Sequence, residues 1–221
     1  LQAILILILV IAAVNILEPL RSVKLSEENR KCLEETVGRI REGMEKSGTA
    51  EKTIVSEEKE RIACIDDNEE ALLLRLRMIE AAKEEVVFAT FDFREDESGS
   101  DMMAAFYAAA ERGVKVKLLL DGMNEFLYLE RSELFRALCT HENVELRIYN
   151  PIDALHILNV NYRMHDKYLI TDEQMYLLGG RNSNDIFLGD RKTGINEDRE
   201  IFVYETKTGE GASFLELEEY F

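Results

Sequence analysis

The sequence is poor in the residue types that mark two common classes of protein. It has three cysteines, Cys32, Cys64 and Cys139, which are odd in number and far apart. This spacing fits neither a metal site nor a disulfide framework, so we expect isolated thiols. Positive charge is also scarce, because 27 Lys+Arg residues face 44 Asp+Glu residues and the formal net charge is -17. Nucleic-acid binding requires a basic face that displaces counterions from phosphates, so we expect no nucleic-acid partner.

Low-complexity tracts and internal repeats are also absent from the region after residue 61. Hydrophobic residues make up 46% of the 221 residues, which supports a packed core and argues against a disordered chain. The length suits one domain of ordinary size with extra segments.

The first segment, LQAILILILVIAAVNIL (1–17), is apolar except for Gln2 and Asn15. As a helix it would be roughly 25 Å long, slightly short of a hydrocarbon core of about 30 Å. The chain starts with Leu1 rather than Met, so we expect upstream residues that complete the span. A cleaved signal peptide and a buried core helix are the alternatives, but Ala12-Ala13-Val14 is a poor cleavage site and no polar stripe is present. The pattern therefore favours a transmembrane anchor at 1–17.

A charged helical stalk and linker are predicted at 18–60. Ser26 can cap a helix over 26–47 and Gly48 can end it, while 48–60 is charged and irregular. Because the helix is mostly polar, we expect it to connect the anchor with the domain that follows.

From about residue 61, strand-like runs alternate with helical patterns. The predicted helices are 69–85, 101–112 and 132–139, and the predicted strands are 86–91, 114–120 and 144–149. Loops are expected at 94–100 and 151–163. Strands that alternate with such helices indicate an α/β sheet with crossover helices, which we place at 61–221.

The segment MHDKYLITDEQMYLLGGRN (164–182) predicts two short strands, 165–171 and 175–178, joined by a tight turn. Because strand side chains alternate between faces, His165 and Lys167 would share a face with Cα atoms about 7 Å apart. Asp172 has the opposite parity and fits a supporting role at the strand end. Gly179-Gly180 permits close backbone approach or positive φ, and Asn182 supplies a neutral donor.

These residue types form a half-site for phosphoryl transfer that needs no metal. An imidazole can attack phosphorus and later leave, which gives a covalent intermediate. A lysine and an asparagine amide can bind the phosphoryl oxygens and stabilise their charge. Each residue alone also fits an ordinary packed histidine or a turn, so the prediction depends on the ordered set.

The pattern His165-x-Lys167-x4-Asp172-x6-Gly179-Gly180-x-Asn182 resembles the signature of the phospholipase D superfamily. RLRMIEAAKEEVVFATFDF (75–93), AAAERGVKVKLLLDG (108–122) and DREIFVYE (198–205) are similar to other segments of that fold. VELRIYNP (144–151) and GGRNSNDIFLG (179–189) resemble the cardiolipin synthase branch. The resemblance covers roughly 61–221 and implies a mixed α/β sheet flanked by helices.

By this resemblance the catalytic residues are His165, Lys167 and Asp172. The phosphate-binding residues are Lys167 and Asn182. Asp198 would orient His165 through its second ring nitrogen, with Glu197 as the alternative in the same loop. Gly179, Gly180 and Asp185 would support the site, Arg181 lines up with the same branch, and no metal or cofactor is implied.

The family uses two such motifs, whereas this chain contains one and has no tryptophan before the acidic residue near 198. GASFLELEEYF (211–221) resembles a helix without a stop signal, so we expect the N-terminal half of a two-motif protein. The implied function is phosphatidyl transfer between phospholipids through a phosphohistidine, at a bacterial cell membrane and on an undetermined side. The alternatives are a single-motif phosphodiesterase or nuclease active as a homodimer, and an inactive scaffold.

Overall fold

The computed structural model describes residues 4, 6–10, 13, 60–153, 155, 157–189, 195–206, 213, 217 and 220. The predicted stalk and linker lie outside the described residues apart from Glu60, as does most of the predicted anchor. The described residues between Ile4 and Ala13 are helical, and their large apolar side chains are exposed. Within the described part of the chain, no helix is both long and apolar enough to cross a membrane.

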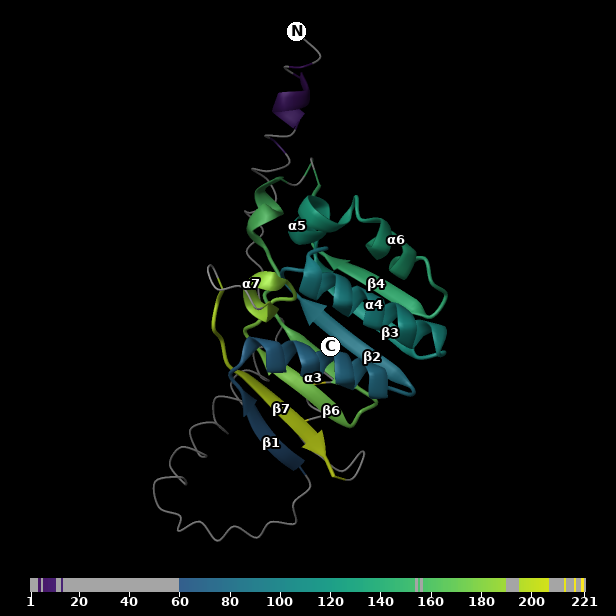
Figure 1. Ribbon diagram of the computed structural model, residues 1–221. Helices are drawn as coiled ribbons and strands as arrows, with labels where there is room; N and C mark the ends of the chain where they lie inside the picture. Colours follow the sequence, from purple (N-terminus) through teal and green to yellow (C-terminus); the bar gives the residue numbers. More distant parts are fainter. Residues whose placement is uncertain are drawn as a thin grey trace, which may run out of the picture. The chain divides into compact units, whose positions relative to one another are not determined.

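Residues Glu58–Phe221 form one compact unit built on a seven-stranded sheet with the order β1-β7-β6-β5-β2-β3-β4. The strands are β1 (Glu60–Ile65), β2 (Glu85–Thr90), β3 (Lys115–Asp121), β4 (Val144–Tyr149), β5 (Tyr168–Thr171), β6 (Met175–Gly179) and β7 (Glu200–Glu205). Strands β2, β3 and β4 are parallel, whereas β5, β6, β7 and β1 add to β2 in antiparallel pairs. The predicted mixed sheet is confirmed (Figure 1).

Three longer helices pack on one face of this sheet (Figure 1). They are α3 (Asn68–Ala81), α4 (Glu97–Glu111) and α6 (Glu133–Cys139), and each begins at an oxygen-bearing N-cap. The shorter elements are α5 (Gly122–Asn124), η1 (Glu125–Leu129), η2 (Ile157–Asn161) and α7 (Asp185–Leu188). Both α5 and α7 lie at the end of the sheet toward which β2, β3 and β4 run.

Several predicted boundaries were wrong for identifiable reasons. Helix α4 begins at Glu97, inside the predicted loop 94–100, because the Asp96 carboxylate accepts a hydrogen bond from Gly99 N and caps the helix early. The strand predicted at 165–171 begins only at Tyr168. Helix α3 stops at Ala81 rather than 85, because the following backbone N–H groups bind a side chain elsewhere in the chain.

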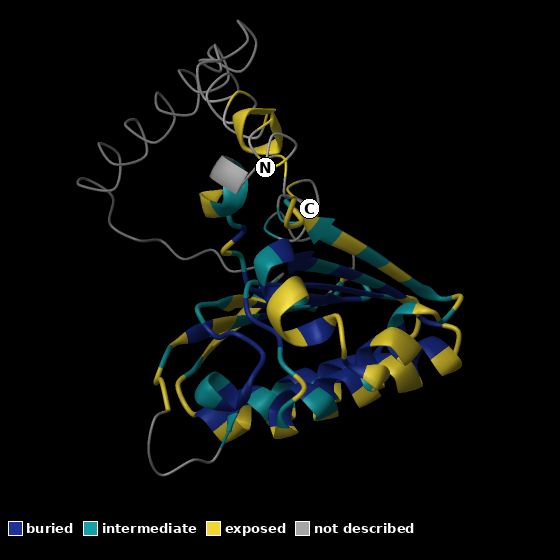
Figure 2. Ribbon diagram, turned by 90° about the horizontal axis from the view of Figure 1, so that it is seen from above, coloured by how far each residue is buried: buried dark blue, intermediate teal, exposed yellow. Residues whose placement is uncertain are grey.

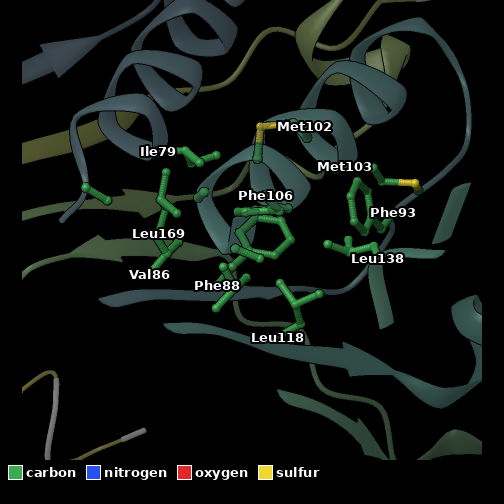
Figure 3. Close-up of a cluster of buried hydrophobic side chains, with 14 of the residues drawn as sticks. Ile79, Val86, Phe88, Phe93, Met102, Met103, Phe106, Leu118, Leu138 and Leu169 are labelled. Atoms are coloured by element: carbon green, nitrogen blue, oxygen red, sulfur yellow. The ribbon is translucent and has the colours of Figure 1, made fainter. Parts of the chain in front are cut away.

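The main core lies between these helices and the sheet, where Figure 2 shows the buried residues concentrated. Phe88 of β2 occupies its centre, with ring centroids 5.0 Å from Phe106 and 5.6 Å from Phe93 (Figure 3). Rings at these distances add edge and offset contacts to the burial of their apolar surface. Because Phe93 lies only three residues after the end of β2 at Thr90, the core also fixes the segment in which the polar residues of that edge lie.

A smaller apolar cluster lies on the opposite face, around Val87, Tyr168 and Ile170, with Leu217 packed against it. Ser213, Leu217 and Tyr220 are helical, as the sequence predicted for the C-terminal segment. The Tyr220 hydroxyl donates to Asp166 Oδ2 at 3.1 Å. The C-terminal residues therefore contact the segment that contains His165.

Two of the cysteines lie in the described part of the chain, and both are free thiols. Cys64 is exposed on β1, and Cys139 is partly buried at the end of α6. Burial raises the pKa of the Cys139 thiol to about 12, which suppresses the nucleophilic thiolate.

Candidate functional site

The predicted site residues lie at one edge of the sheet, where four neighbouring strands meet. Segment 91–94 follows β2, 165–167 precedes β5, 180–182 follows β6 and 195–199 precedes β7. Because these strands alternate in direction, the end of one lies beside the beginning of the next. The antiparallel addition of β5 to β2 therefore brings segments from distant parts of the sequence together.

His165 is exposed at this edge, and its ring packs against the side chain of Phe91. The two ring centroids are 5.1 Å apart with an interplanar angle of 52°. The Lys167 ammonium lies 5.7 Å from the centroid of the same Phe91 ring. Phe91 therefore supports both predicted reactive side chains. The sequence analysis did not identify it, although it lies in the FDF segment that carries the family resemblance.

Lys167 is buried, with 4% of its surface exposed, and its Nζ donates to the His165 carbonyl at 2.6 Å. Burial lowers the pKa of Lys167, and the nearby carboxylates of Asp166, Asp198 and Asp92 oppose that shift. A bound phosphate would add negative charge beside this ammonium and favour its charged form. An amine held in this way suits a phosphate-binding role.

Asn182 is buried in a polar network that the sequence analysis did not identify. Its Oδ1 accepts a hydrogen bond from Asp92 N at 3.1 Å. The Asp92 carboxylate in turn accepts from Arg94 Nε at 2.9 Å and from Asn124 Nδ2 at 2.6 Å. Ser183 N donates to Asp92 O at 3.0 Å. With Oδ1 engaged, the Asn182 amide is oriented, and its Nδ2 makes no hydrogen bond to another described residue.

The glycine pair is explained by close approach rather than by positive φ. A Cβ on Gly180 would lie 2.0 Å from Asp198 Oδ2, and a Cβ on Gly179 would lie 2.4 Å from Glu200 Cγ. Neither glycine has a positive φ. The pair therefore lets the start of β7 lie directly against the end of the motif.

Asp198 is half-buried, whereas its neighbour Glu197 is exposed. The Asp198 carboxylate lies against Gly180 and raises the pKa of Lys167 by its charge. Among the described residues, no hydrogen bond joins Asp198 to the His165 ring. Of the two acids that the sequence left open, Asp198 is therefore the one at the site, while its role in orienting His165 stays a prediction.

Arg181 is fully buried and lies away from the exposed edge. Its guanidinium donates to Asn68 Oδ1 at 3.0 Å, to Ile65 O at 3.1 Å and to Asp66 O at 2.5 Å. It also forms an ion pair with the buried Glu200 at 3.4 Å. Arg181 thus joins the end of the motif to the β1–α3 junction and holds the backbone next to Asn182.

Asp185 is buried at the start of α7 and makes a reciprocal contact with the start of α4. Its Oδ1 accepts from Ser98 N at 2.8 Å, and its own N donates to Asp96 Oδ2 at 2.9 Å. Asp185 also lines a cavity of about 410 Å³ between α3, α4 and α7, a set of elements that does not include the His165 segment. These contacts join the start of α7 to the start of α4, and the support that Asp185 gives to the site stays a prediction.

Asp121, at the end of β3, fixes the backbone that enters the motif. It is fully buried, and its carboxylate accepts from Arg163 Nη1 at 3.1 Å and from Met164 N at 3.0 Å. The sequence indicated Asp121 only as the end of a strand. Since residue 164 directly precedes His165, Asp121 is a positioning residue for the histidine.

Asp172 lies at the opposite end of β5 from His165. Asp172 and Glu173 both have positive φ, 52° and 50°, and Gln174 N donates to Thr171 O at 3.0 Å. The Asp172 carboxylate accepts from the backbone N–H groups of residues 83, 84 and 85 at 2.7, 2.8 and 3.0 Å. These contacts correspond to the supporting role that strand parity predicted. They place its carboxylate on the α3–β2 connection and not beside the imidazole.

Replacement of Asp172 by alanine is expected to lower the free energy of unfolding by about 2 to 3 kcal/mol. Three backbone donors lose a charged acceptor, and alanine tolerates positive φ poorly. Urea unfolding measures the change. Asp172→Asn, which keeps an acceptor and the backbone preference, should lose less. If Asp172→Ala unfolds like the unmodified chain yet the complete enzyme loses its turnover, the structural role is wrong.

Together these residues provide an exposed imidazole, a buried ammonium and an oriented amide at one edge. The imidazole can form and release a bond to phosphorus, and the other two groups can hold phosphoryl oxygens. Phe91 packs against the imidazole, and the backbone N–H of Asp92 orients the amide. Asn124 binds the Asp92 carboxylate, and Asp121 accepts from the backbone that precedes His165. The arrangement is therefore suited to phosphoryl transfer through a covalent histidine.

Comparisons with known proteins find a matching family and related proteins. Residues 76–207 match the family described as cardiolipin synthase, PLD-like domain. Cardiolipin synthase C of Escherichia coli (strain K12) is 29% identical over 143 residues, which cover 61% of this chain and 30% of that protein. Cardiolipin synthase B of the same strain is 32% identical over 127 residues, which cover 57% of this chain and 30% of that protein. The matching segment thus spans 30% of the length of each of these relatives.

Solved structures share the fold at lower sequence identity. NucT from Helicobacter pylori superposes with a TM-score of 0.56 at 20% identity, covering 73% of this chain and 92% of that chain. Nuc from Salmonella typhimurium, a phospholipase D family member, gives a TM-score of 0.52 at 19% identity and covers 73% and 91%. A domain of this extent thus makes up nearly all of those two chains.

Proposed function

We propose that this chain is the phosphatidyltransferase module of a membrane enzyme. The proposal starts from its family, because the chain belongs to the cardiolipin synthase PLD-like domains. It would move a phosphatidyl group from one phospholipid to a second lipid alcohol or to water. The observation that carries the proposal is the convergence of His165, Lys167 and Asn182 at one edge of the sheet, inside the matched region. One of the two motifs that a phosphohistidine mechanism requires lies there.

In the proposed reaction, one histidine attacks the phosphorus of the donor phosphodiester. The bond from phosphorus to the departing alcohol breaks, and a second histidine gives that alcohol a proton. The acceptor alcohol then attacks phosphorus, its proton returns to the second histidine, and the first imidazole leaves. His165 takes one of these two roles. Lys167 and Asn182 bind the phosphoryl oxygens in both steps, and Asp198 supports the lysine and the histidine.

A second motif must complete the site, because His165 can serve as nucleophile or as acid but not as both in one step. We assign the second motif to a further part of the native protein. The matched segment covers only 30% of each cardiolipin synthase, which leaves room for it in proteins of that kind. The apolar run at residues 1–17 is proposed as a single anchor in a bacterial cell membrane. Its exposed apolar helical residues support that assignment.

The alternative function is a single-motif phosphodiesterase that completes its site by pairing with a second copy of the same chain. One observation favours it: a domain of this extent accounts for 92% and 91% of the NucT and Nuc chains. The formal net charge of -17 counts against a nucleic-acid substrate.

A paired assay on the complete gene product tests the two functions. In one arm the enzyme receives a fluorescent phospholipid in mixed micelles with a chelator, and in the other it receives single-stranded and duplex DNA. We expect a new labelled phospholipid or phosphatidic acid and intact DNA, since the proposed chemistry needs no metal. DNA cleavage with unchanged lipid would reject phosphatidyl transfer and establish the alternative.

A further inference from the structure

Beside the candidate site, the structure exposes large apolar side chains on two loops. They come from η1, which follows α5, and from the loop between β4 and β5. Their exposed fractions are 52% for Phe126, 58% for Leu127, 46% for Tyr128, 40% for Ile152 and 62% for Tyr162. We refer to these five residues as the apolar rim. Single exposed apolar residues are ordinary, but several together on neighbouring loops mark an interaction surface.

The two loops of the apolar rim are packed against each other. Gly122 lies so close to the second loop that a Cβ on it would be 2.5 Å from Pro151 Cα. Asn150 Nδ2 donates to the carbonyls of Asn159 and Tyr162 at 2.7 and 2.8 Å. Packing and hydrogen bonds therefore fix the two loops in the conformation that exposes the rim side chains. Residues Glu125–Leu129 also form a π-helical turn, a conformation found often at functional sites.

Direct contacts connect the apolar rim to the phosphate-binding residues. The Arg94 guanidinium lies 4.5 Å from the centroid of the Tyr128 ring and is paired with Asp92 at 2.7 Å. Asp92 is also the residue that orients Asn182. Tyr162 is three residues before His165, and the intervening backbone is held by Asp121. The rim and the imidazole thus belong to the same end of the sheet.

The composition of this edge fits the boundary between lipid and water. Tyrosine and phenylalanine concentrate in that boundary, and arginine side chains reach headgroup phosphates from beside them. Arg94 is placed in this way, since its guanidinium lies over the Tyr128 ring and its side chain is 31% exposed. Because the chain carries a formal net charge of -17, attraction to anionic lipid by charge alone is disfavoured, and contact must come from apolar insertion.

We propose that the apolar rim docks into the membrane–water interface and holds the entrance to His165 against the lipid surface. The inference rests on the proposed function, in which the phosphodiester to be cleaved lies in a phospholipid headgroup. A substrate that stays in the bilayer can reach an exposed imidazole only if the protein edge around that imidazole meets the bilayer. The rim supplies such an edge, and it adds a second attachment to the proposed anchor.

The absence of tryptophan from the chain allows a direct test, since a single introduced tryptophan is the only one that emits. The 221-residue chain is reconstituted in vesicles of phosphatidylglycerol and phosphatidylethanolamine that contain a lipid spin-labelled near the headgroup. Phe126→Trp and Tyr162→Trp are compared with Leu73→Trp, which replaces a side chain of similar exposure (47%) on α3. Rim tryptophans at the headgroup level should lose about half of their emission or more, and Leu73→Trp should lose little.

Two results would overturn the docking proposal. One is equal quenching at all three positions, and the other is a rim emission that shifts with protein concentration in detergent alone, which would indicate contact between copies. The readout involves no turnover, so the two proposals fail separately. If the rim of the 221-residue chain is quenched but the complete protein transfers no phosphatidyl group, the proposed function alone is overturned. Transfer by the complete protein, together with an unquenched rim in the 221-residue chain, overturns the docking alone.

Discussion

Replacement of His165 by alanine in the complete protein is expected to lower phosphatidyl transfer by at least about a thousandfold. The imidazole is the exposed reactive group at the site, and its ring packs against the ring of Phe91. Among the histidines that the structure describes, His165 is the one at this edge. Initial rates with a fluorescent phospholipid measure the loss.

Rapid alkaline quenching followed by mass spectrometry identifies which role His165 takes. A phosphatidyl adduct on the peptide that contains His165 makes it the nucleophile, and the adduct should vanish in His165→Ala. An adduct on another histidine that accumulates in His165→Ala makes His165 the general acid. Activity of His165→Ala close to that of the unmodified enzyme would contradict both roles.

His141 provides the matched control for this experiment. It is another of the three histidines, and its ring contacts Glu111 at 3.1 Å and Tyr107 at a centroid distance of 5.5 Å. These partners lie in the last turns of α4, and His141 lies between α6 and the start of β4, at the other end of the parallel strands. His141→Ala should therefore retain the rate of the unmodified enzyme. An equal loss in both variants would mean that damage to the fold, and not chemistry, explains the effect of His165→Ala.

Replacement of Arg181 by methionine is expected to lower the free energy of unfolding by about 3 to 5 kcal/mol, the cost of breaking a buried charge network. The Arg181 and Glu200 side chains are fully buried. Glu200 also accepts two hydrogen bonds from the buried Arg75, at 2.8 and 2.5 Å. Loss of Arg181 leaves the side chain of Asn68 and two backbone carbonyls without their donor. Urea unfolding of the chain measures the change.

Arg199 offers a control that removes the same functional group from a nearby position. It pairs with the Asp66 side chain at 2.6 Å, but both side chains are mostly exposed, at 69% and 61%. Solvent screens such a pair and competes for its hydrogen bonds, so Arg199→Met should unfold at nearly the same urea concentration as the unmodified chain. If the two methionine variants were equally destabilised, the buried network would have no special role in this fold.

The sequence predicted the sheet and its longer helices well, because their signals are local. Period-two and helical patterns indicated β2, β3, β4, α3 and most of α4 within a few residues. It missed the edge strand β1 and the short elements α5, η1, η2 and α7. Their conformation depends on contacts with other loops, such as Asn124 with Asp92 and Asp185 with Ser98. A segment of four or five residues has too little periodicity of its own to indicate a helix.

By itself the sequence determined which groups carry the candidate chemistry, since the order and spacing of His165, Lys167 and Asn182 are fixed along one short stretch of chain. The tertiary structure alone decided what surrounds them. Strand β5 adds antiparallel to β2, which brings Phe91 against His165 and Asp92 against Asn182. The same topology pairs Arg75 with Glu200 across 125 residues. Such partners depend on strand order, which arises from the packing of the whole domain and leaves no trace in local spacing.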